Sequence, residues 1–588
     1  MKPPRRQRVA IVGSGMAGLV AGYLLANDKE GRFEVEVLEM QDCLSLDSAS
    51  YTLPRPRQPP FPPPCCSDAV SVPTNGTGTA NGSTVKPKSA STIKTQTQTQ
   101  TAETDEQDEG EERVDLPMRA FAAGYYDNLR KLYTHLGVTF EEPRFVYSLS
   151  TLASTGDSPT TKKRTQTDSQ TYFIHSSNNH ILPPIRPQGL SLLRWVIEAA
   201  YLFFWYTYFT FACFLIAPRR SEKSSIATKC GLITARTQGE TLRSFLTRIH
   251  VPTYYTTRYF LPLMASVTTC THDELLNFPA RDIVTYARRT FRRPHYTVRG
   301  GVRQAEGKLS KGLKVKFGAK VTSVKTLEDG SGRVKVRWRW THSSSAKGRS
   351  DDGRVGADSA TSSSATAIAE REEHEEYEEE VYDKAIIAVT PDVVGSIFEP
   401  LANEMADIPT TSVQSVVHQD FARIGASSAH LRGDPRFQSR TIMATSSSSS
   451  SSRSNPTLPV SGPVSAAIHM FTDLHTGRTE SVHEHRSSML ITTYPIDNAI
   501  DEAKILHRAK FTRVLRSARS REVVNGIFNL GLKSVNKEGE GEDGWKSGDG
   551  NVYLVGGWCW DGMVMLEGCI VSAIRVADAL GVDVPWAR

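Results

Sequence analysis

The sequence predicts an α/β fold, and three features near its start support that prediction. Residues 8–12 have the apolar character of a short buried strand, and residues 16–27 have the length and composition of a helix. Residues 33–40 alternate apolar and charged side chains, as a second strand does. A strand, a glycine-rich turn, a helix and a strand in this order form a β-α-β unit, which builds a parallel sheet covered by helices.

The rest of the chain supplies further elements and several inserts. Residues 54–112 are rich in Pro, Ser, Thr and Gln, so they cannot bury enough apolar surface to order themselves and are predicted to be a disordered insert. A second insert, residues 341–380, ends in an acidic run, and the serine tract 446–452 is predicted to be a solvated loop. The predicted elements are a helix over 120–137 that ends at Gly137, several helices over 242–293, a Gly-Gly turn, helix and strands over 298–324, strands at 334–340, 381–389 and 552–556, and a closing helix over 568–580.

Composition excludes several classes of protein. The net charge of +6 is mild and Lys and Arg are spread along the chain, so no nucleic-acid partner is expected. The eight cysteines show no C-x-x-C pair and no regular spacing. A zinc site or a disulfide framework is therefore not expected, and a reducing compartment is the default.

The turn after the first strand carries a nucleotide-binding pattern. Residues Gly13, Ser14, Gly15, Met16, Ala17 and Gly18 fit G-x-G-x-x-G. The first glycine permits the tight turn, the second removes the Cβ that would block a pyrophosphate, and the third lets the helix approach the strand. Glu39 ends the second strand, where an acid can accept hydrogen bonds from both ribose hydroxyls. The alternative is a glycine-rich turn with an unrelated surface acid, but the strand-turn-helix context favours a Rossmann-like unit.

The C-terminal region distinguishes FAD from NAD by resemblance. Residues 553–558 (YLVGGW), 561–562 (DG) and 566–573 (LEGCIVSA) resemble the C-terminal flavin motif of the flavin-containing amine oxidase superfamily. In that family a strand ends in glycine beside the ribityl chain, and the N-terminus of the next helix faces the isoalloxazine ring. The resemblance implies FAD as the cofactor, with contacts at Gly557, Trp558 and Glu567.

Other segments resemble the same superfamily. Residues 297–301 (TVRGG) resemble its Gly-Gly motif, and Val321 then matches the valine whose backbone contacts adenine. Residues 383–391 (DKAIIAVTP) resemble the strand-to-loop that ends in a proline beside the cofactor. Residues 114–118 (VDLPM) resemble a subgroup of uncharacterised NAD/FAD-binding proteins, some of them associated with enzymes that modify fatty-acyl chains, and this implies a cofactor contact at Met118. The chain departs from the family at residues 44–50 (LSLDSAS), where the family has G-G-R/H.

These motifs imply a discontinuous domain. They assign residues 1–53, 295–400 and 546–588 to a Rossmann-like FAD-binding domain. Residues 113–294 and 401–545 are then predicted to form an α+β substrate domain, with the apolar segment 195–217 in its first part and the serine-rich loop in its second.

The resemblance predicts an FAD-dependent oxidoreductase that receives a hydride from a small or lipid-like substrate. Trp558 and Trp560 stand where the family places residues in front of the flavin ring, so they are the candidates for an aromatic wall around the substrate. Two packed core tryptophans are the alternative. A flavin-binding, membrane-associated scaffold or partner protein without turnover is the alternative function, and an NAD-dependent dehydrogenase is disfavoured because it would not use the C-terminal motif.

The apolar segment 195–217 carries one charge, Glu198, and is flanked by Arg and Lys. Its length suits a helix that crosses the hydrocarbon core of a membrane. Trp205, Tyr206 and Tyr208 fall in its middle, however, whereas spanning helices prefer such residues at the interfaces. A buried helix of the substrate domain and a helix embedded in a membrane surface remain alternatives. The flanking charge favours membrane contact in an intracellular, membrane-associated protein, with a cytoplasmic protein as the alternative.

Overall fold

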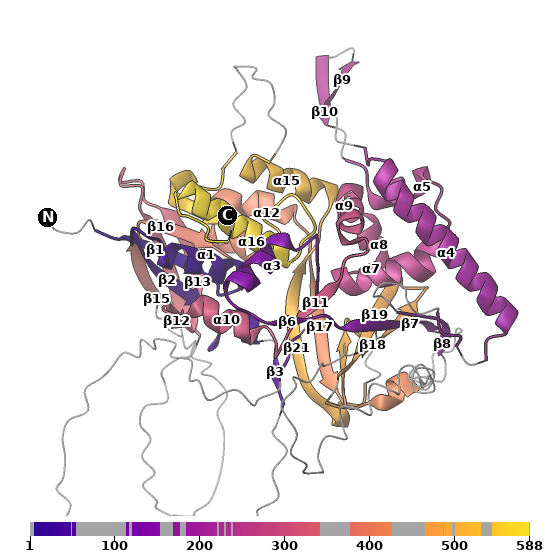
Figure 1. Ribbon diagram of the computed structural model, residues 1–588. Helices are drawn as coiled ribbons and strands as arrows, with labels where there is room; N and C mark the ends of the chain where they lie inside the picture. Colours follow the sequence, from indigo (N-terminus) through magenta and orange to yellow (C-terminus); the bar gives the residue numbers. More distant parts are fainter. Residues whose placement is uncertain are drawn as a thin grey trace, which may run out of the picture.

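The computed structural model contains a parallel-sheet domain and a second domain built on a larger, mainly antiparallel sheet (Figure 1). It describes residues 5–48, 50–53, 113–116, 120–152, 169–176, 184–187, 189–219, 223–228, 231–236, 239–341, 377–425, 465–485, 487–496, 500–530 and 544–586. The sequence-predicted insert 54–112, the serine tract 446–452 and Met118 lie outside these residues.

The first domain is a five-stranded sheet in which all neighbours are parallel. Its strands, in spatial order, are β12 (Lys314–Phe317), β2 (Phe33–Glu39), β1 (Gln7–Val12), β16 (Lys384–Ile387) and β22 (Val552–Leu554). The strands come from three distant parts of the chain, so the predicted discontinuous α/β fold is confirmed. Val9, Ile11 and Ile386 are fully buried, as expected for strands that are covered on both faces.

Each face of the parallel sheet has its own cover. One face carries the helices α1 (Met16–Ala26), α10 (Arg303–Ser310) and α16 (Leu566–Ala579), which share one apolar cluster. The other face packs against the antiparallel sheet of β13 (Ala319–Thr326), β14 (Val334–Trp340) and β15 (Tyr377–Tyr382), and against α11 (Pro391–Ile397), α12 (Ala402–Ala406) and α15 (Ala518–Phe528). The strand order and these covers are those of a doubly wound nucleotide-binding domain.

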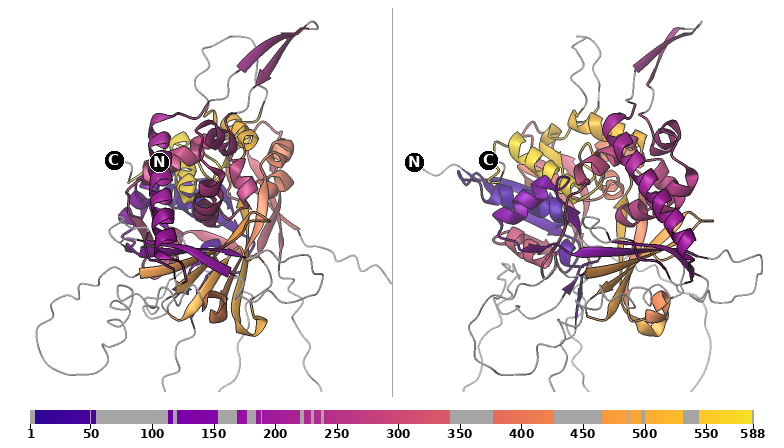
Figure 2. Two further views of the ribbon diagram at one scale, coloured as in Figure 1. Left: turned by 90° about the vertical axis from the view of Figure 1, so that its right-hand side faces the viewer. Right: turned by 45° about the vertical axis from the view of Figure 1, so that its right-hand side comes forward.

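The second domain is α+β. Its seven-stranded sheet is antiparallel except for the β18–β7 pair, and its strands in spatial order are β21 (Ile505–Val514), β17 (Thr410–His418), β20 (Met489–Thr493), β19 (Arg478–His485), β18 (Ser465–Asp473), β7 (Arg144–Leu152) and β8 (Ser169–Ser176). A layer of helices lies over one side of this sheet (Figure 2). These helices are α4 (Leu192–Leu215), α5 (Leu242–Arg248), α6 (Thr253–Tyr255), a π-helical turn (Thr256–Phe260), α7 (Leu261–Thr268), α8 (His272–Leu276) and α9 (Ala280–Thr290).

Two predicted boundaries were wrong. The helix predicted over 120–137 begins only at Asp127, as α3 (Asp127–His135), because Gly124 turns the chain with φ +84° and a Cβ there would lie 2.4 Å from a backbone oxygen of Arg289. The last acidic residues assigned to the insert 341–380, at positions 378–380, are part of β15, because Glu379 pairs with Lys335 at 3.3 Å and with Arg337, both on the neighbouring strand.

Two elements also pack outside their predicted domain. Helix α15, predicted within the substrate part 401–545, packs through Val524 and Ile527 on the parallel-sheet side. Helix α3, predicted mainly with the substrate domain, is held against α16. Domain membership depends here on which apolar face covers which sheet, and linear position does not reveal it.

The ends of the predicted insert 54–112 lie together. Strand β3 (Tyr51–Thr52) pairs antiparallel with β4 (Arg113–Val114). We therefore expect that a short glycine-containing turn can replace residues 54–112, because the entropy cost of closing a loop falls as the loop shortens. The melting temperature of the shortened chain should equal or exceed that of the full chain. A fall of more than about 3 °C, roughly 1 kcal/mol for a large domain, would contradict the expectation.

Buried histidines make the second domain sensitive to acid. Burial lowers the pKa of His418, His483 and His272 to about 4 each. His418 Nε2 and Thr492 Oγ1 form a hydrogen bond of 2.8 Å. In the unfolded chain a histidine titrates near pH 6.5, so the stability due to the neutral rings is complete above about pH 6.5 and is lost as the pH falls towards 4.

We expect the melting temperature to fall steeply between pH 6.5 and 4, because each of these histidines costs about 1.4 kcal/mol per pH unit in that window. Thermal unfolding at a series of pH values measures this dependence. His418→Gln should flatten the profile, whereas substitution of the exposed residue His250 should not. A flat wild-type profile down to pH 5 would contradict the assignment.

Candidate functional site

The glycine loop joins β1 to α1 at the edge where the parallel strands end. Gly13 has φ +97°, and a Cβ on it would lie 3.0 Å from Val389 Cγ1, on the loop after β16. A Cβ on Gly18 would lie 2.2 Å from the Gly13 carbonyl oxygen. A Cβ on Gly15 would meet nothing within 4 Å. The fold therefore requires two of the glycines, and the third leaves open space at the start of α1.

The N-terminus of α1 faces this open space without a side-chain cap. Gly15 is the N-cap residue, and the first intrahelical hydrogen bond runs from Leu19 N to Gly15 O at 3.0 Å. The preceding N–H groups, among them those of Met16 and Ala17, have no acceptor within the helix. The first turn contains no acidic residue. Such an end attracts an anionic group such as a pyrophosphate.

Glu39 connects this loop to the end of β2. Its carboxylate is buried and accepts hydrogen bonds from Ser14 N at 2.9 Å, Ser14 Oγ at 2.6 Å and Gln41 N at 3.0 Å. A carboxylate accepts about four hydrogen bonds, so Glu39 keeps capacity for a ribose hydroxyl. Ser14 Oγ also accepts from Ser45 N at 2.8 Å and so holds the short helix α2 (Ser45–Ser48), which lies in the segment that departs from the family pattern.

The Gly-Gly turn is held by a residue that sequence reasoning did not select. Asp115 accepts hydrogen bonds from Val302 N at 3.0 and 3.1 Å, and a Cβ on Gly301 would lie 2.9 Å from its carboxylate. Asp115, from one segment that resembles the family, therefore lies against Gly301, from the other. The acidic residue Asp115 was the feature of the sequence that could have indicated this contact.

Val321 lies on the same side of the sheet as the end of β2. It pairs with Trp338 and shares an apolar cluster with Val12 and Leu38. The residue before its strand, Gly318, donates its N–H to Gln41 O at 2.9 Å. This position suits the predicted adenine contact, which stays a prediction.

The loop after β22 carries the two candidate tryptophans. Trp558 is buried, and its Nε1 donates to Val389 O at 3.1 Å, beside the glycine loop. Trp560 is half-buried, its Nε1 donates to Met563 O at 2.8 Å, and its ring meets Tyr125 edge-on with centroids 5.9 Å apart. Both rings pack on protein and both N–H groups are satisfied. An aromatic wall around a substrate stays a prediction.

Gly557 and Gly568 allow this loop to cross the start of α16. A Cβ on Gly568 would lie 2.4 Å from the Gly557 carbonyl oxygen and equally close to the Trp560 ring, and a Cβ on Gly557 would lie 3.1 Å from Met565 O. The N-terminus of α16, at Met565, has no side-chain cap. It is a second helix start without a side-chain cap, and the acid in its first turn, Glu567, is turned towards α3.

Glu567 has a structural role in this geometry. Its buried carboxylate accepts from Asn128 N at 3.0 Å, Asn128 Nδ2 at 2.7 Å and Leu129 N at 3.1 Å, so it caps the start of α3. Burial raises the pKa of Glu567, and the bonds from Asn128 and Leu129 act against that rise. Since both oxygens are bound to α3, a cofactor contact by this carboxylate gains no support from the structure.

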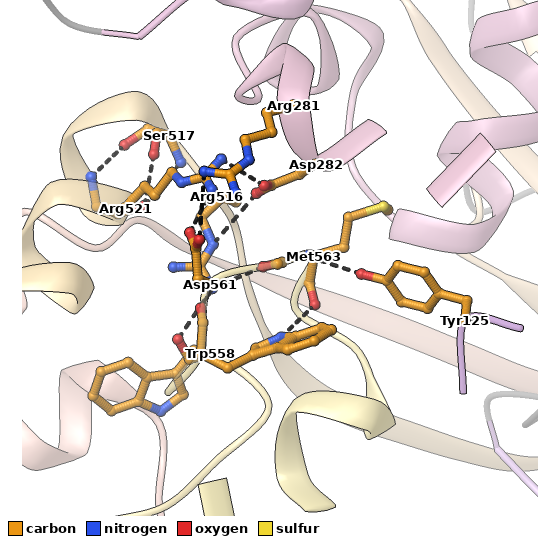
Figure 3. Close-up of polar contacts among 12 residues, drawn as sticks. Tyr125, Arg281, Asp282, Arg516, Ser517, Arg521, Trp558, Asp561 and Met563 are labelled. Carbon is orange, nitrogen blue, oxygen red and sulfur yellow. Dashed lines mark hydrogen bonds and ion pairs between the residues drawn. The ribbon is translucent and has the colours of Figure 1, made fainter. Parts of the chain in front are cut away.

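A cluster of charged side chains binds the backbone of residues 558–562, the loop that carries Trp558 and Trp560 (Figure 3). Arg516 is almost fully buried, and its Nη2 donates to the carbonyl oxygens of Trp558, Trp560 and Gly562 at 3.0–3.1 Å. Its Nε lies 4.0 Å from Asp282 Oδ2, an ion pair without a hydrogen bond. The guanidinium thereby fixes the backbone of the loop that follows β22.

The other members of the cluster join α9, α15 and the loop. Arg521 donates to Asp282 Oδ1 at 2.7 Å and also to Asp561, and Arg281 lies 3.6 Å from Asp561. Burial raises the pKa of Asp282, whereas Arg521 and Arg516 lower it. These residues come from three distant segments without a common motif, and no sequence pattern groups them.

The comparisons with known proteins agree with the first domain. Residues 11–63 match the NAD(P)-binding Rossmann-like domain, so this region is a Rossmann-like unit. No curated protein matches the chain. Two similar solved structures are a CLA-producing fatty acid isomerase from P. acnes, at 11% identity, TM-score 0.46 and coverage of 97% of this chain and 98% of that one, and a redesigned triple mutant of putrescine oxidase, at 10% identity, TM-score 0.44 and coverage of 98% of each chain.

Proposed function

We propose that the protein binds FAD and works as a flavin-dependent oxidoreductase on a small or lipid-like substrate. The observation that carries this proposal is the open space at Gly15, beside the uncapped start of α1 and the Glu39 carboxylate. It lies between β1 and β16, where the strand order reverses, and ligands of open α/β sheets bind at such switch points.

The choice of FAD over NAD rests on the second uncapped helix. Helix α16 follows β22, whose end lies at the same edge of the sheet as the end of β1, because all the strands are parallel. One helix start would face the pyrophosphate through Gly15, Met16 and Ala17. The start of α16, with Gly557, would face a second group with negative partial charge. FAD has both a pyrophosphate and ring carbonyl oxygens that carry negative partial charge, and the resemblance of residues 553–573 to the flavin motif supports the same assignment.

A bound flavin would provide the hydride acceptor, and the protein would orient the reactants and exclude water. Arg516 holds the carbonyl groups of residues 558–562 and so fixes the loop beside the proposed ring site. Tyr125 and Tyr286, with ring centroids 4.9 Å apart, and Trp560 form a packed aromatic group next to that loop. This group would keep water from one side of the site.

The test begins with the absorption spectrum of the purified full-length protein. We expect flavin absorbance and, after denaturation, release of FAD identified by mass spectrometry. Anaerobic mixing with small amines and with lipid-like compounds should bleach the flavin for a substrate. Bound FAD that no compound bleaches would favour the non-catalytic scaffold, and tightly bound NAD without flavin would contradict the proposal.

A further inference from the structure

Helix α4 presents a continuous apolar face to solvent. Within the described residues it is the one helix long and apolar enough to cross a membrane. It runs along the outer side of the helical layer, away from the parallel sheet (Figure 1). Phe203, Phe204 and Phe211 are 73%, 60% and 61% exposed. Eight exposed large apolar side chains lie on one face of the helix at intervals that fit the helical repeat: Leu193, Val196, Ile197, Phe203, Phe204, Phe211, Phe214 and Leu215.

The opposite face of α4 is fixed to the domain along most of its length. Near its start, Glu198 accepts hydrogen bonds from Tyr254 OH at 2.9 Å and from Tyr259 OH. In its middle, the Phe209 and Phe260 rings lie 4.9 Å apart. Near its end, Ala212 and Cys213 are buried. From Glu198 to Cys213 the helix axis covers about 22 Å at 1.5 Å per residue, with protein beside it throughout.

This packing argues against a crossing helix. A helix that spans the hydrocarbon core needs about 20 residues within lipid. Helix α4 could reach that depth only by carrying α6, α7 and α9, with exposed charges such as Arg288 and Arg289, into the bilayer, or by leaving its partners. The geometry instead allows the outer face to lie in the plane of a membrane interface, as amphipathic monotopic helices do.

Positive charges lie at both ends of the apolar face of α4. Arg194 is exposed in the first turn of α4. At the other end, the Arg288 guanidinium lies over the Phe214 ring, 5.7 Å from its centroid, and Arg289, Arg292 and Arg293 are exposed nearby in the sequence. The only acid of α4, Glu198, is bonded on the inward side. An apolar face with cations at both ends complements a bilayer that contains anionic lipid.

We propose that α4 docks the protein, in plane, on an anionic membrane surface. Exposed apolar patches of this kind mark interaction sites in soluble proteins. A second copy of the chain is the weaker occupant, because both ends of α4 carry arginines, so a contact between two α4 helices brings cations of the two copies together in either orientation. The proposal is independent of the cofactor, so it holds or fails apart from the proposed oxidoreductase function.

The experiment is flotation of the purified full-length protein with preformed vesicles of phosphatidylcholine alone or with 30% phosphatidylserine (about one anionic lipid in three). The test variant carries Phe204→Asp and Phe211→Asp on the outer face. The matched control carries Leu474→Asp and Leu506→Asp, two exposed apolar residues outside α4. A charge variant carries Arg288→Gln and Arg292→Gln. Circular dichroism and thermal unfolding check that every variant is folded.

The wild type and the control should float with the anionic vesicles, and the test variant should bind at least about tenfold more weakly. The charge variant should lose the preference for phosphatidylserine and keep weak binding to both vesicles. Absence of wild-type binding, or equal binding by the folded test variant, would overturn the proposal. A wild-type dimer in light scattering that the test variant converts to a monomer would assign the face to a second copy instead and would also overturn it.

Discussion

Gly15→Val should abolish binding of FAD and leave the fold intact. Gly15 has φ −64° and ψ 171°, which an L-residue adopts without strain, and a Cβ there meets no atom of the protein within 4 Å. The added side chain instead fills the space at the start of α1 where the pyrophosphate is proposed to lie. We expect the affinity for FAD to fall by at least about 100-fold, which corresponds to about 2.7 kcal/mol. Titration of the flavin-free protein with FAD, followed by fluorescence, measures this loss.

The matched control is Gly18→Ala, three residues further along, in the first turn of α1. Its Cβ would lie 2.2 Å from the Gly13 carbonyl oxygen, so α1 must move away from β1. This variant should lose stability by about 2–4 kcal/mol, because backbone displacement in a packed core is among the costlier effects of single substitutions. The two glycines therefore separate binding from folding. A folded Gly15→Val protein that binds FAD normally would place the cofactor elsewhere and remove the main support for the proposed function.

The first domain was predictable because its signals are local. The roles of Gly13, Gly15 and Gly18 follow from the spacing of one short motif, and the structure has the steric consequences that the motif implies. Glu39 was placed correctly at the end of β2 by the alternation of residues 33–40. The hydrogen bonds from Ser14 to Glu39 were not predicted, because a serine in a glycine loop has no distinctive pattern.

The remainder depended on tertiary contacts. Glu567 fits a family motif, but its carboxylate caps α3, and the sequence around Asn128 shows no sign of this. The acidic residues 378–380 were assigned to the insert and form a strand because Lys335 and Arg337 lie across from them. Segment 195–217 was correctly seen as apolar. Only the structure separates the face that packs on Tyr259 and Phe260 from the face that is exposed.

Arg516→Met should be among the most destabilising single substitutions in the protein. It removes three hydrogen bonds to the carbonyl groups of the loop after β22 and one of the cations that face the buried Asp282. Removing one member of a buried charge group typically costs about 3–5 kcal/mol, because the remaining charge loses a partner in a place that water does not reach. Urea unfolding of both proteins measures the difference. A change within about 0.5 kcal/mol would show that the cluster does not stabilise the fold.

A second substitution separates charge from hydrogen bonding. The double variant Arg516→Met, Asp282→Leu also lacks the Asp282 carboxylate, which in the single variant has lost one of its cations. Part of the lost stability should therefore return. The double-mutant cycle gives the coupling energy between the two residues. Arg516→Lys keeps a cation, but a lysine ammonium cannot reproduce the planar fork of an arginine. Its loop should be looser than in the wild type, and the spectrum of bound flavin should change even where the stability is largely kept.

The pH dependence of the stability of Arg516→Met tests whether the variant is destabilised through the charge of Asp282. Burial raises the pKa of Asp282 in the folded protein, so the contribution of this residue to stability is fully present below its unfolded pKa, near 3.9, and is lost as the pH rises through its folded pKa. Loss of Arg516 removes a group that lowers that pKa, which extends the loss to higher pH. The stability difference between the variant and the wild type should therefore shrink as the pH falls, while the acid titration of the buried histidines affects both proteins alike. A difference that stays constant from pH 8 to pH 5 would attribute the effect of Arg516 to its carbonyl hydrogen bonds alone.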